Sequence, residues 1–161
     1  MIKRIVVDVS SQNLQGFNSE QQLIFERQVA TAKNGLGQVM GSECTPTGEH
    51  RIRAKIGAGM AVNTVFVGRR PTNEIYSPAL AESFPNRDWI LTRILWLCGN
   101  EVGHNRGGSV DTQRRFIYIH GAPDSHPMGV PSSHGCIKMR NEDMIALFDQ
   151  VLTGTPILIA G

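Results

Sequence analysis

A histidine and a cysteine, His120 and Cys136, have the types and spacing expected of a nucleophile and its base. His120 follows the apolar segment RRFIYI (114–119), which would hold it rigidly, and Gly121 allows the chain to turn after it. Sixteen positions after His120, a proline-rich loop returns at Cys136. A free thiol has a pKa of about 8.5, so a nearby imidazole is needed to form the thiolate at neutral pH. The pair therefore indicates nucleophilic chemistry, with His120 as the general base.

Gly135, immediately before the cysteine, would let a substrate carbonyl approach closely. The backbone N–H groups of Gly135 and Cys136 then form a candidate oxyanion hole, which suits acyl transfer through a thioester. A packing role for Cys136 stays open at this point, because a lone cysteine is most often a small buried hydrophobe. We expect that packing role for Cys44 and Cys98, since neither has a neighbouring histidine.

His134 stands two residues before Cys136 and shares its face on an extended segment. A base so close along the chain is sterically cramped, so we assign His134 a supporting role. A zinc hydrolase is a distant alternative, with His120, His126, His134 and Cys136 as ligands, but their gaps of six, eight and two residues differ from common zinc motifs. We expect no metal and no cofactor. We expect the remaining histidines to lie in solvent: His50, His104 and His126.

Most of the chain that must position these residues has the apolar patterns of β-strands. Alternating or continuous apolar runs predict strands at 2–9, 23–31, 50–56, 62–67, 89–97, 114–119 and 154–160. One amphipathic helix is predicted over 141–151, with Asn141 as its N-cap. Two polar stretches, 77–88 and 99–113, are predicted to be loops, and the second is a candidate wall or lid over His120. The expected fold is mainly β: a β-sandwich of two packed sheets with one late α-helix.

The bulk composition fits one soluble domain spanning residues 1–161. Hydrophobic residues make up 40% and charged residues 19%, and the net charge of +2 lacks the clustered basic footprint of a nucleic-acid binder. No apolar stretch is long enough for a membrane span. The N-terminus reads as a strand and not as a secretory signal. We therefore expect a cytoplasmic protein if Met1 is the native start, and otherwise a periplasmic one. The sequence predicts no particular oligomeric state.

The segment IYIHGAPDSHPMGVPSSHGCIKM (117–139) resembles the signature of the L,D-transpeptidase catalytic domain, the YkuD-like family: a strand-end His-Gly, a loop, and then Ser-His-Gly-Cys. The similarity spans the chain. IVVDVSSQNL (5–14) resembles the opening strand of the family, TPTGEHRI (45–52) its Thr-Pro-x-Gly hairpin, and NEDMIALFDQVLTGTPILI (141–159) its closing helix and strand.

The resemblance implies a β-sandwich enzyme acting on peptidoglycan stem peptides, at the bond between the L-centre of a third-position diamino acid and D-alanine. Cys136 would be the nucleophile and His120 the base, and the backbone carbonyl of Gly121 would orient the imidazole. The N–H group of His134 would join those of Gly135 and Cys136 in the oxyanion hole.

Two more residues follow from the same resemblance. Ser133 would brace the loop beside the substrate. Lys138 stands where the family commonly has arginine; it keeps the positive charge for a substrate carboxylate but loses the bidentate fork.

The shared motifs leave the acceptor of the acyl group open. Water would release a shortened peptide, and an amine from a second stem peptide would form a crosslink. Some short relatives without an export signal act as cytoplasmic L,D-carboxypeptidases in peptidoglycan recycling, and this chain resembles those. We therefore expect an L,D-carboxypeptidase acting on stem tetrapeptides (muropeptides), with an L,D-transpeptidase as the alternative.

Overall fold

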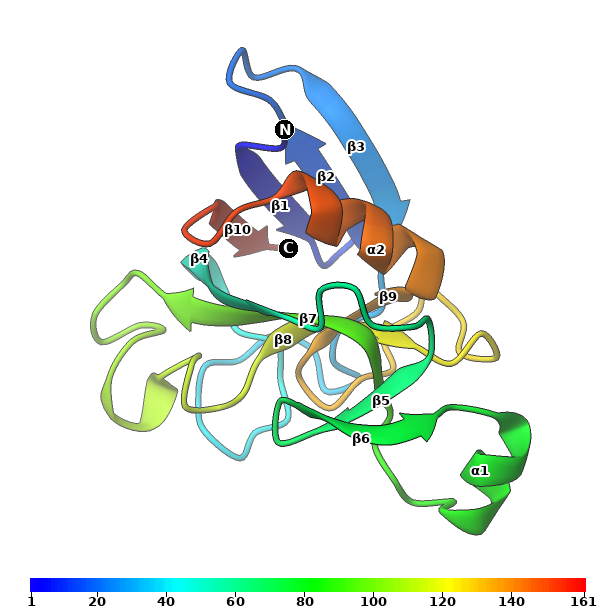
Figure 1. The fold of residues 1–161 in the computed structure, drawn as a ribbon. Helices are drawn as coiled ribbons and strands as arrows, with labels where there is room; N and C mark the ends of the chain where they lie inside the picture. Colours follow the sequence, from blue (N-terminus) through cyan, green and yellow to red (C-terminus); the bar gives the residue numbers. More distant parts are fainter.

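The structure is a computed structural model that describes residues 1–161. It contains ten strands, two α-helices and one short 3-10 turn at Gly108–Val110 (Figure 1). No helix is long and apolar enough to cross a membrane. The elements, in chain order, are β1 (Arg4–Asp8), β2 (Asn13–Phe17), β3 (Leu23–Gln28), β4 (Gly48–Ile56), β5 (Thr64–Val67), β6 (Arg70–Ile75), α1 (Pro78–Ser83), β7 (Ile90–Gly99), β8 (Tyr118–Ala122), β9 (Ile137–Arg140), α2 (Asn141–Gln150) and β10 (Pro156–Ala160).

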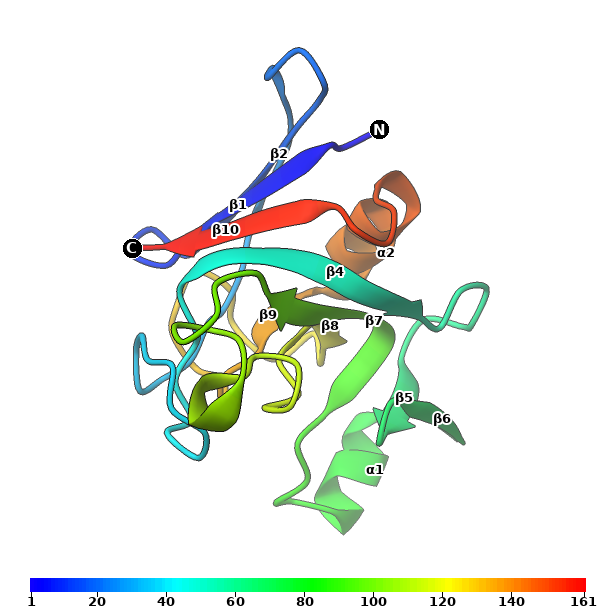
Figure 2. The same ribbon diagram turned by 90° about the vertical axis from the view of Figure 1, so that its left-hand side faces the viewer.

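Strand β7 is the hub of a curled, mixed sheet. Along one edge, β7 pairs with β5 near its start and with β4 over the rest of its length. Its other edge pairs with β8, and β8 pairs in parallel with β9. Beyond β4 the order continues through β10, β1, β2 and β3, and β1 and β10 are parallel neighbours (Figure 2). The apolar run predicted as a buried strand at 89–97 forms most of β7, and consecutive residues of β7 are buried, as expected of a strand covered on both faces.

The sheet closes on itself beside β9. The N–H of Ala30 donates to the carbonyl of Lys138, and the N–H of Lys138 donates to the carbonyl of Ala30, both at 2.9 Å. A second bridge joins Ala32 to Ser133. These contacts connect the segment after β3 to β9, so the strands form a nearly complete ring.

Nineteen buried residues fill the inside of this ring, and α2 lies against β7, β8 and β9 (Figure 1). Helix α2 contributes Met144, Leu147 and Phe148 from its apolar face. Each fully buried side chain of this kind contributes roughly 1.5–3 kcal/mol to folding. The core thus lies directly behind β8 and β9, and it makes those two strands a rigid base.

The predicted fold class is confirmed: the chain is mainly β, with mixed pairing and a late helix. The two packed sheets of the prediction are joined by hydrogen bonds into one curled sheet. Strand β8 begins later than predicted, at Tyr118, and continues through His120 to Ala122, because Phe116 has a φ of 57° that interrupts an extended chain.

Several local predictions were wrong. The stretch 77–88 contains α1, whose first turn is capped by the Ser77 side chain accepting from the N–H of Leu80; the helix is too short to show periodicity in the sequence. Asn141 is not the N-cap of α2: Arg140 occupies that position, and Asn141 is a buried first-turn residue.

The loop at 99–113 does not cover His120. Its buried Asn105 donates to the carbonyls of Thr47 and Glu49, which ties the loop to the start of β4 instead. His50, predicted to be in solvent, is fully buried: its Nδ1 bonds the Gly48 carbonyl, and its Nε2 bonds the Thr112 hydroxyl.

The buried His50 predicts a stability change in mild acid. Burial lowers the pKa of His50 from 6.5 to about 4. The unfolded chain therefore binds more protons than the folded chain between these two pH values, and stability is lost as the pH falls through that window, by about 3 kcal/mol. Urea unfolding from pH 7 to pH 4 should show the free energies of unfolding of the wild type and His50→Asn converging. His104→Asn, at an exposed histidine, should track the wild type; parallel curves for all three proteins would contradict the prediction.

Candidate active site

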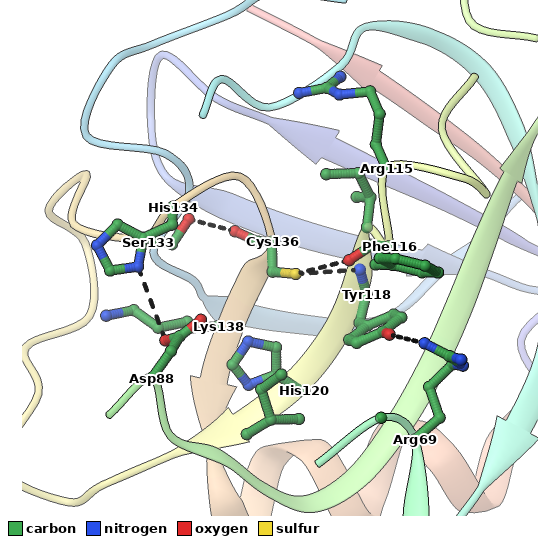
Figure 3. Close-up of a pocket in the computed structure, with 13 residues that line it drawn as sticks. Arg69, Asp88, Arg115, Phe116, Tyr118, His120, Ser133, His134, Cys136 and Lys138 are labelled. Carbon is green, nitrogen blue, oxygen red and sulfur yellow. Dashed lines mark hydrogen bonds and ion pairs between the residues drawn. The ribbon is translucent and has the colours of Figure 1, made fainter. Parts of the chain in front are cut away.

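A cavity of about 380 Å³ opens where β8 and β9 meet the turn between β5 and β6. His120 and Cys136 both line it, so the two residues paired by the sequence are brought together (Figure 3). Its walls are Gly68, Arg69, Asp88, Ile90, Arg115, Phe116, Ile117, Tyr118, His120, Ser133, His134, Cys136 and Lys138.

The His120 ring is fixed in one tautomer by its own neighbour. Its Nδ1 lies 2.6 Å from the Gly121 carbonyl, and since a carbonyl only accepts, Nδ1 must carry the proton. The lone pair of the neutral ring is therefore on Nε2. The side chain is only 2% exposed, and burial lowers the pKa of His120, although the Gly121 carbonyl opposes that effect. At neutral pH the imidazole is thus an unprotonated base.

Gly121 has no room for a side chain. An added Cβ would lie 2.4 Å from the Asn141 Oδ1 and 2.7 Å from the Leu91 carbonyl. The Asn141 amide is held in turn: its Oδ1 accepts from the Thr92 hydroxyl at 2.6 Å, and its Nδ2 donates to the Asn63 Oδ1 at 3.0 Å. This buried network packs directly behind the peptide that orients His120.

The Cys136 sulfur makes two hydrogen bonds with the chain that enters β8. It accepts from the N–H of Tyr118 at 3.3 Å, and its S–H donates to the carbonyl of Phe116 at 3.4 Å (Figure 3). Burial raises the pKa of the thiol to about 12, although the Tyr118 N–H and the Arg115 charge oppose this effect. The resting pair is therefore a neutral thiol beside a neutral imidazole, and the amide of Tyr118 is placed to stabilise the thiolate when it forms.

The loop before Cys136 is braced from within and from outside. The Ser133 hydroxyl donates to the Cys136 carbonyl at 2.5 Å, and the Thr45 hydroxyl donates to the Gly135 carbonyl at 2.9 Å. Gly135 has a φ of 132°, a conformation that favours glycine. These two hydrogen bonds hold the loop before Cys136 to its neighbours, and Thr45 belongs to the Thr-Pro-x-Gly hairpin.

One prediction for the oxyanion hole needs correction. The N–H of Gly135 is not free, because it donates to the Ser133 hydroxyl at 3.2 Å. The N–H groups of His134 and Cys136 make no hydrogen bond and are the available donors in this loop. The His134 ring points away from the sulfur and lies 3.8 Å from a carboxylate oxygen of Asp88, with both side chains largely exposed.

Lys138 lies on β9 directly opposite His120 on β8. Its side chain reaches the Nδ1 of His126 at 3.3 Å. His126 is therefore half-buried against Lys138 and does not lie in solvent as predicted. Cys98 is buried as predicted, and burial raises the pKa of its thiol; Cys44 is half-buried.

Residues that the motif did not reveal form the far wall. The Arg69 guanidinium lies against the rings of both Trp96 and Phe116, 4.8 and 4.7 Å from their centres, and donates to the Tyr118 hydroxyl at 3.0 Å. Tyr118 shares a strand face with His120, so alternation could have indicated it. Asp88 had no such signal, because it lies in a loop far from the motif.

No three histidine, cysteine, aspartate or glutamate side chains lie together in a way that could hold a metal ion. The site instead has a thiol, an imidazole and free backbone donors around one cavity. This geometry is typical of a thiol acyl-transfer site.

The family model of the L,D-transpeptidase catalytic domain (YkuD) matches residues 2–159. The chain therefore belongs to this family. A curated relative, the probable L,D-transpeptidase YbiS of Escherichia coli K12, is 42% identical over 43 residues, which are 27% of this chain and 14% of that protein.

Solved structures share the fold. An L,D-transpeptidase of Enterococcus faecium has a TM-score of 0.59 at 17% identity, covering 99% of this chain and 50% of that one. L,D-transpeptidase 3 of Mycobacterium tuberculosis, in complex with a faropenem-derived adduct, has a TM-score of 0.57 at 15% identity, covering 98% of this chain and 60% of that one. The chain thus spans about half the length of these structures.

The high pKa of the Cys136 thiol predicts slow alkylation at neutral pH. Because only the thiolate reacts with iodoacetamide, the rate at Cys136 should rise about tenfold per pH unit from pH 7 to pH 10 with no plateau. Peptide mass spectrometry of a Cys44→Ala/Cys98→Ala protein isolates this thiol. A plateau already present at pH 6 would mean that Cys136 and His120 rest as a thiolate–imidazolium pair, contrary to the structure.

Proposed function

We propose that this domain cleaves the L,D bond between the third-position diamino acid and D-alanine of a peptidoglycan stem tetrapeptide, through a thioester on Cys136. The observation that carries this proposal is the placement of Cys136 and His120 around one cavity, with Nδ1 of His120 held by the Gly121 carbonyl. That hydrogen bond leaves Nε2 as the base, the role needed beside a thiol nucleophile.

In the first half-reaction, Nε2 of His120 takes the thiol proton as the sulfur attacks the carbonyl carbon of the third residue. The N–H groups of His134 and Cys136 receive the oxyanion of the tetrahedral intermediate. The intermediate collapses, the carbon–nitrogen bond breaks, and the imidazolium returns the proton to the amine of the departing D-alanine. The acyl group is left on sulfur as a thioester.

Water is the proposed acceptor in the second half-reaction. The acceptor must reach the thioester and give its proton to His120, and that side chain is only 2% exposed. A molecule as small as water reaches both the thioester and the buried imidazole more easily than a peptide amine does. His120 deprotonates the water, and the hydroxyl adds to the thioester. The carbon–sulfur bond then breaks to release a tripeptide, and the imidazolium returns its proton to the sulfur, which restores the thiol. The proposed activity is therefore that of an L,D-carboxypeptidase, and the sequence-based proposal of a cytoplasmic recycling role is compatible with it.

An L,D-transpeptidase is the second candidate. A neighbouring cavity of about 320 Å³ shares Arg115, Phe116, Ile117 and His134 with the first, and includes Met40. A second stem peptide would occupy this cavity, present its amine to the thioester and form a crosslink.

A mass assay separates these outcomes. A diaminopimelate-containing tetrapeptide is incubated with and without an acceptor peptide; loss of D-alanine without dimer is expected, whereas a dimer would identify the transferase. Cys136→Ala should reduce turnover by about 10³-fold or more, and His120→Gln by about 10²–10⁴-fold. Cys98→Ala, at a buried cysteine outside the cavity, is the matched control and should keep turnover. Full activity of Cys136→Ala would overturn the cysteine mechanism.

A penem offers an independent test of the nucleophile. Faropenem gives an adduct in the structure of the M. tuberculosis relative. If Cys136 is an acylating thiol, intact-mass spectrometry should show one faropenem-derived adduct on the wild type, mapped to Cys136 by digestion. Cys44→Ala should still be modified. An adduct of equal yield on Cys136→Ala would assign the reactive group elsewhere.

A further inference from the structure

Arg115 lies at the edge of the Cys136 cavity, and its side chain holds a neighbouring segment of the chain. The residue also lines the adjoining cavity of about 320 Å³. Its Nη1 donates to the Gly37 carbonyl at 3.1 Å, and its Nη2 donates to the Cys44 carbonyl at 2.6 Å and to the Ser42 hydroxyl at 3.4 Å. One guanidinium therefore fastens three points of a single segment to the chain that enters β8.

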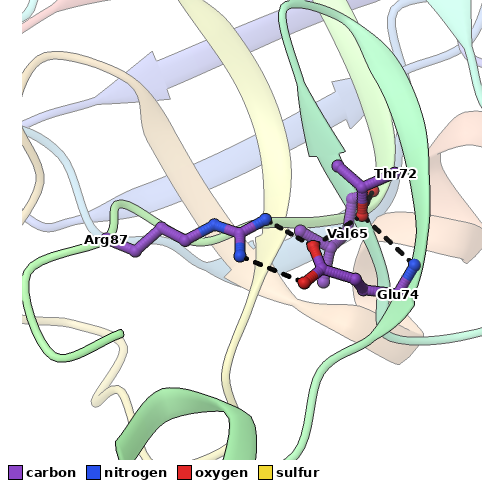
Figure 4. Close-up of polar contacts among 4 residues, drawn as sticks. All are labelled: Val65, Thr72, Glu74 and Arg87. Carbon is purple, nitrogen blue, oxygen red and sulfur yellow. Dashed lines mark hydrogen bonds and ion pairs between the residues drawn. The ribbon is translucent and has the colours of Figure 1, made fainter. Parts of the chain in front are cut away.

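The acceptors of Arg115 are all neutral, which distinguishes it from an arginine in a salt bridge. Arg87 shows the salt-bridged arrangement: its guanidinium bonds both oxygens of the Glu74 carboxylate, at 2.5 and 3.3 Å (Figure 4). Arg115 is half-buried and has no carboxylate within 4 Å. Its donors therefore fix backbone geometry, a task for which the planar, rigid guanidinium is well suited.

The shortest of these hydrogen bonds holds the peptide group before Thr45. The carbonyl of Cys44 belongs to the peptide that joins Cys44 to Thr45, so Arg115 grips that peptide directly. Thr45 is fully buried, and its N–H donates to the Gly35 carbonyl at 2.9 Å. Its hydroxyl accepts from the N–H of Ala32 at 2.9 Å. The Thr45 hydroxyl is therefore held in one position.

That hydroxyl sets the direction of one proposed oxyanion donor. It donates to the Gly135 carbonyl at 2.9 Å, and this carbonyl shares a peptide group with the N–H of Cys136. Because a trans peptide is planar, with its C=O and N–H pointing in opposite directions, a fixed carbonyl also fixes the N–H. The N–H of Cys136 is one of the two unpaired donors of the loop. Thr45 thus aims this donor, although it does not line the cavity.

The carbonyl that Arg115 holds also packs against the loop before Cys136. A Cβ added at Gly135 would lie 3.3 Å from this oxygen and 3.2 Å from Cδ1 of Ile117. The guanidinium itself points away from the Cys136 sulfur (Figure 3). Arg115 therefore acts on the reacting atoms through the segment that it holds.

We propose that Arg115 is a positioning residue for the oxyanion hole, acting through the Cys44–Thr45 peptide and the Thr45 hydroxyl on the N–H of Cys136. This inference rests on the proposed function, because that N–H is one of its two oxyanion donors. Loss of Arg115 or of the Thr45 hydroxyl frees the Gly135–Cys136 peptide to rotate. The tetrahedral intermediate is then held less well, whereas the sulfur keeps its own hydrogen bonds.

Two reactions of the same thiolate separate this role from a general structural one. With 4-nitrophenyl acetate, the Cys136 sulfur bonds to the acetyl carbon through a tetrahedral oxyanion, and the carbon–oxygen bond breaks to release 4-nitrophenolate. With iodoacetamide, the sulfur displaces iodide and no oxyanion forms. Both reactions need the thiolate, so the ratio of their rate constants at pH 9 cancels the fraction of thiolate.

The first rate is the release of 4-nitrophenolate after subtraction of the release by the matching Cys136→Ala protein. The second is the alkylation of Cys136, read by peptide mass spectrometry. The ratio is acyl transfer divided by alkylation.

Arg115→Met and Thr45→Val should each lower the ratio by about 10- to 100-fold, short of the 10²–10³-fold cost of deleting an oxyanion-hole donor outright. Thr45→Ser should recover most of this loss, because it keeps the hydroxyl. Arg115→Lys keeps the charge without the fork of donors and should stay low. The double variant Arg115→Met/Thr45→Val should be no lower than Thr45→Val alone, since both changes act on one peptide. Arg53→Met, at an exposed arginine on β4, is the control and should match the wild type.

Equal slowing of both reactions in Arg115→Met would assign the arginine a general structural role, and full recovery in Arg115→Lys would assign its effect to charge. Either result overturns the proposal, as would a wild type that transfers the acetyl group no faster than Arg115→Met. A variant that fails to fold is recognised by faster alkylation, because its thiol regains an ordinary pKa of about 8.5. Thr45→Val and Thr45→Ser then carry the test. If the ratio falls as expected but the wild type leaves the tetrapeptide uncleaved, the positioning role stands and the proposed function fails.

Discussion

The candidate active site depends on two reciprocal hydrogen bonds between the backbones of Ala30 and Lys138. They close the curled sheet, and they fix β9 between β8 and the segment after β3. The same residue, Lys138, directs its side chain to the cavity walls. Because β9 begins immediately after Cys136, the contacts that close the sheet also fix the position of the candidate nucleophile.

Burial then determines the chemistry of the pair. Desolvation of the buried His120 and of the half-buried Cys136 favours the neutral form of both groups, and the Gly121 carbonyl decides which ring nitrogen is basic. No carboxylate is needed for that orientation, in contrast to triads with an aspartate. In the proposed reaction, charge develops only when substrate is present, and the unpaired N–H groups of His134 and Cys136 are the donors proposed to receive it.

The sequence predicted the parts of the site that belong to one local motif. His120, Cys136 and the braced loop follow from strand ends, glycines and spacing. It did not predict Asp88, Arg69 or the buried state of His50, because these depend on which segments the closed sheet brings together. The engaged N–H of Gly135 was also missed, since it depends on a side-chain rotamer of Ser133. The strands themselves were predictable from their alternation, whereas the short helix α1 had too few residues to show a period.

The position of β10 sets the order in which this chain can fold. The last strand of this domain, β10, lies inside the sheet, paired with β1 on one side and β4 on the other. Until residues 156–160 are available, β1 and β4 each present an open edge, and the ring cannot be completed. Pairing residue 5 with residue 157 gives the fold many contacts between distant parts of the sequence, which slows folding. The domain therefore acquires its closed sheet only once residues 156–160 are in place between β1 and β4.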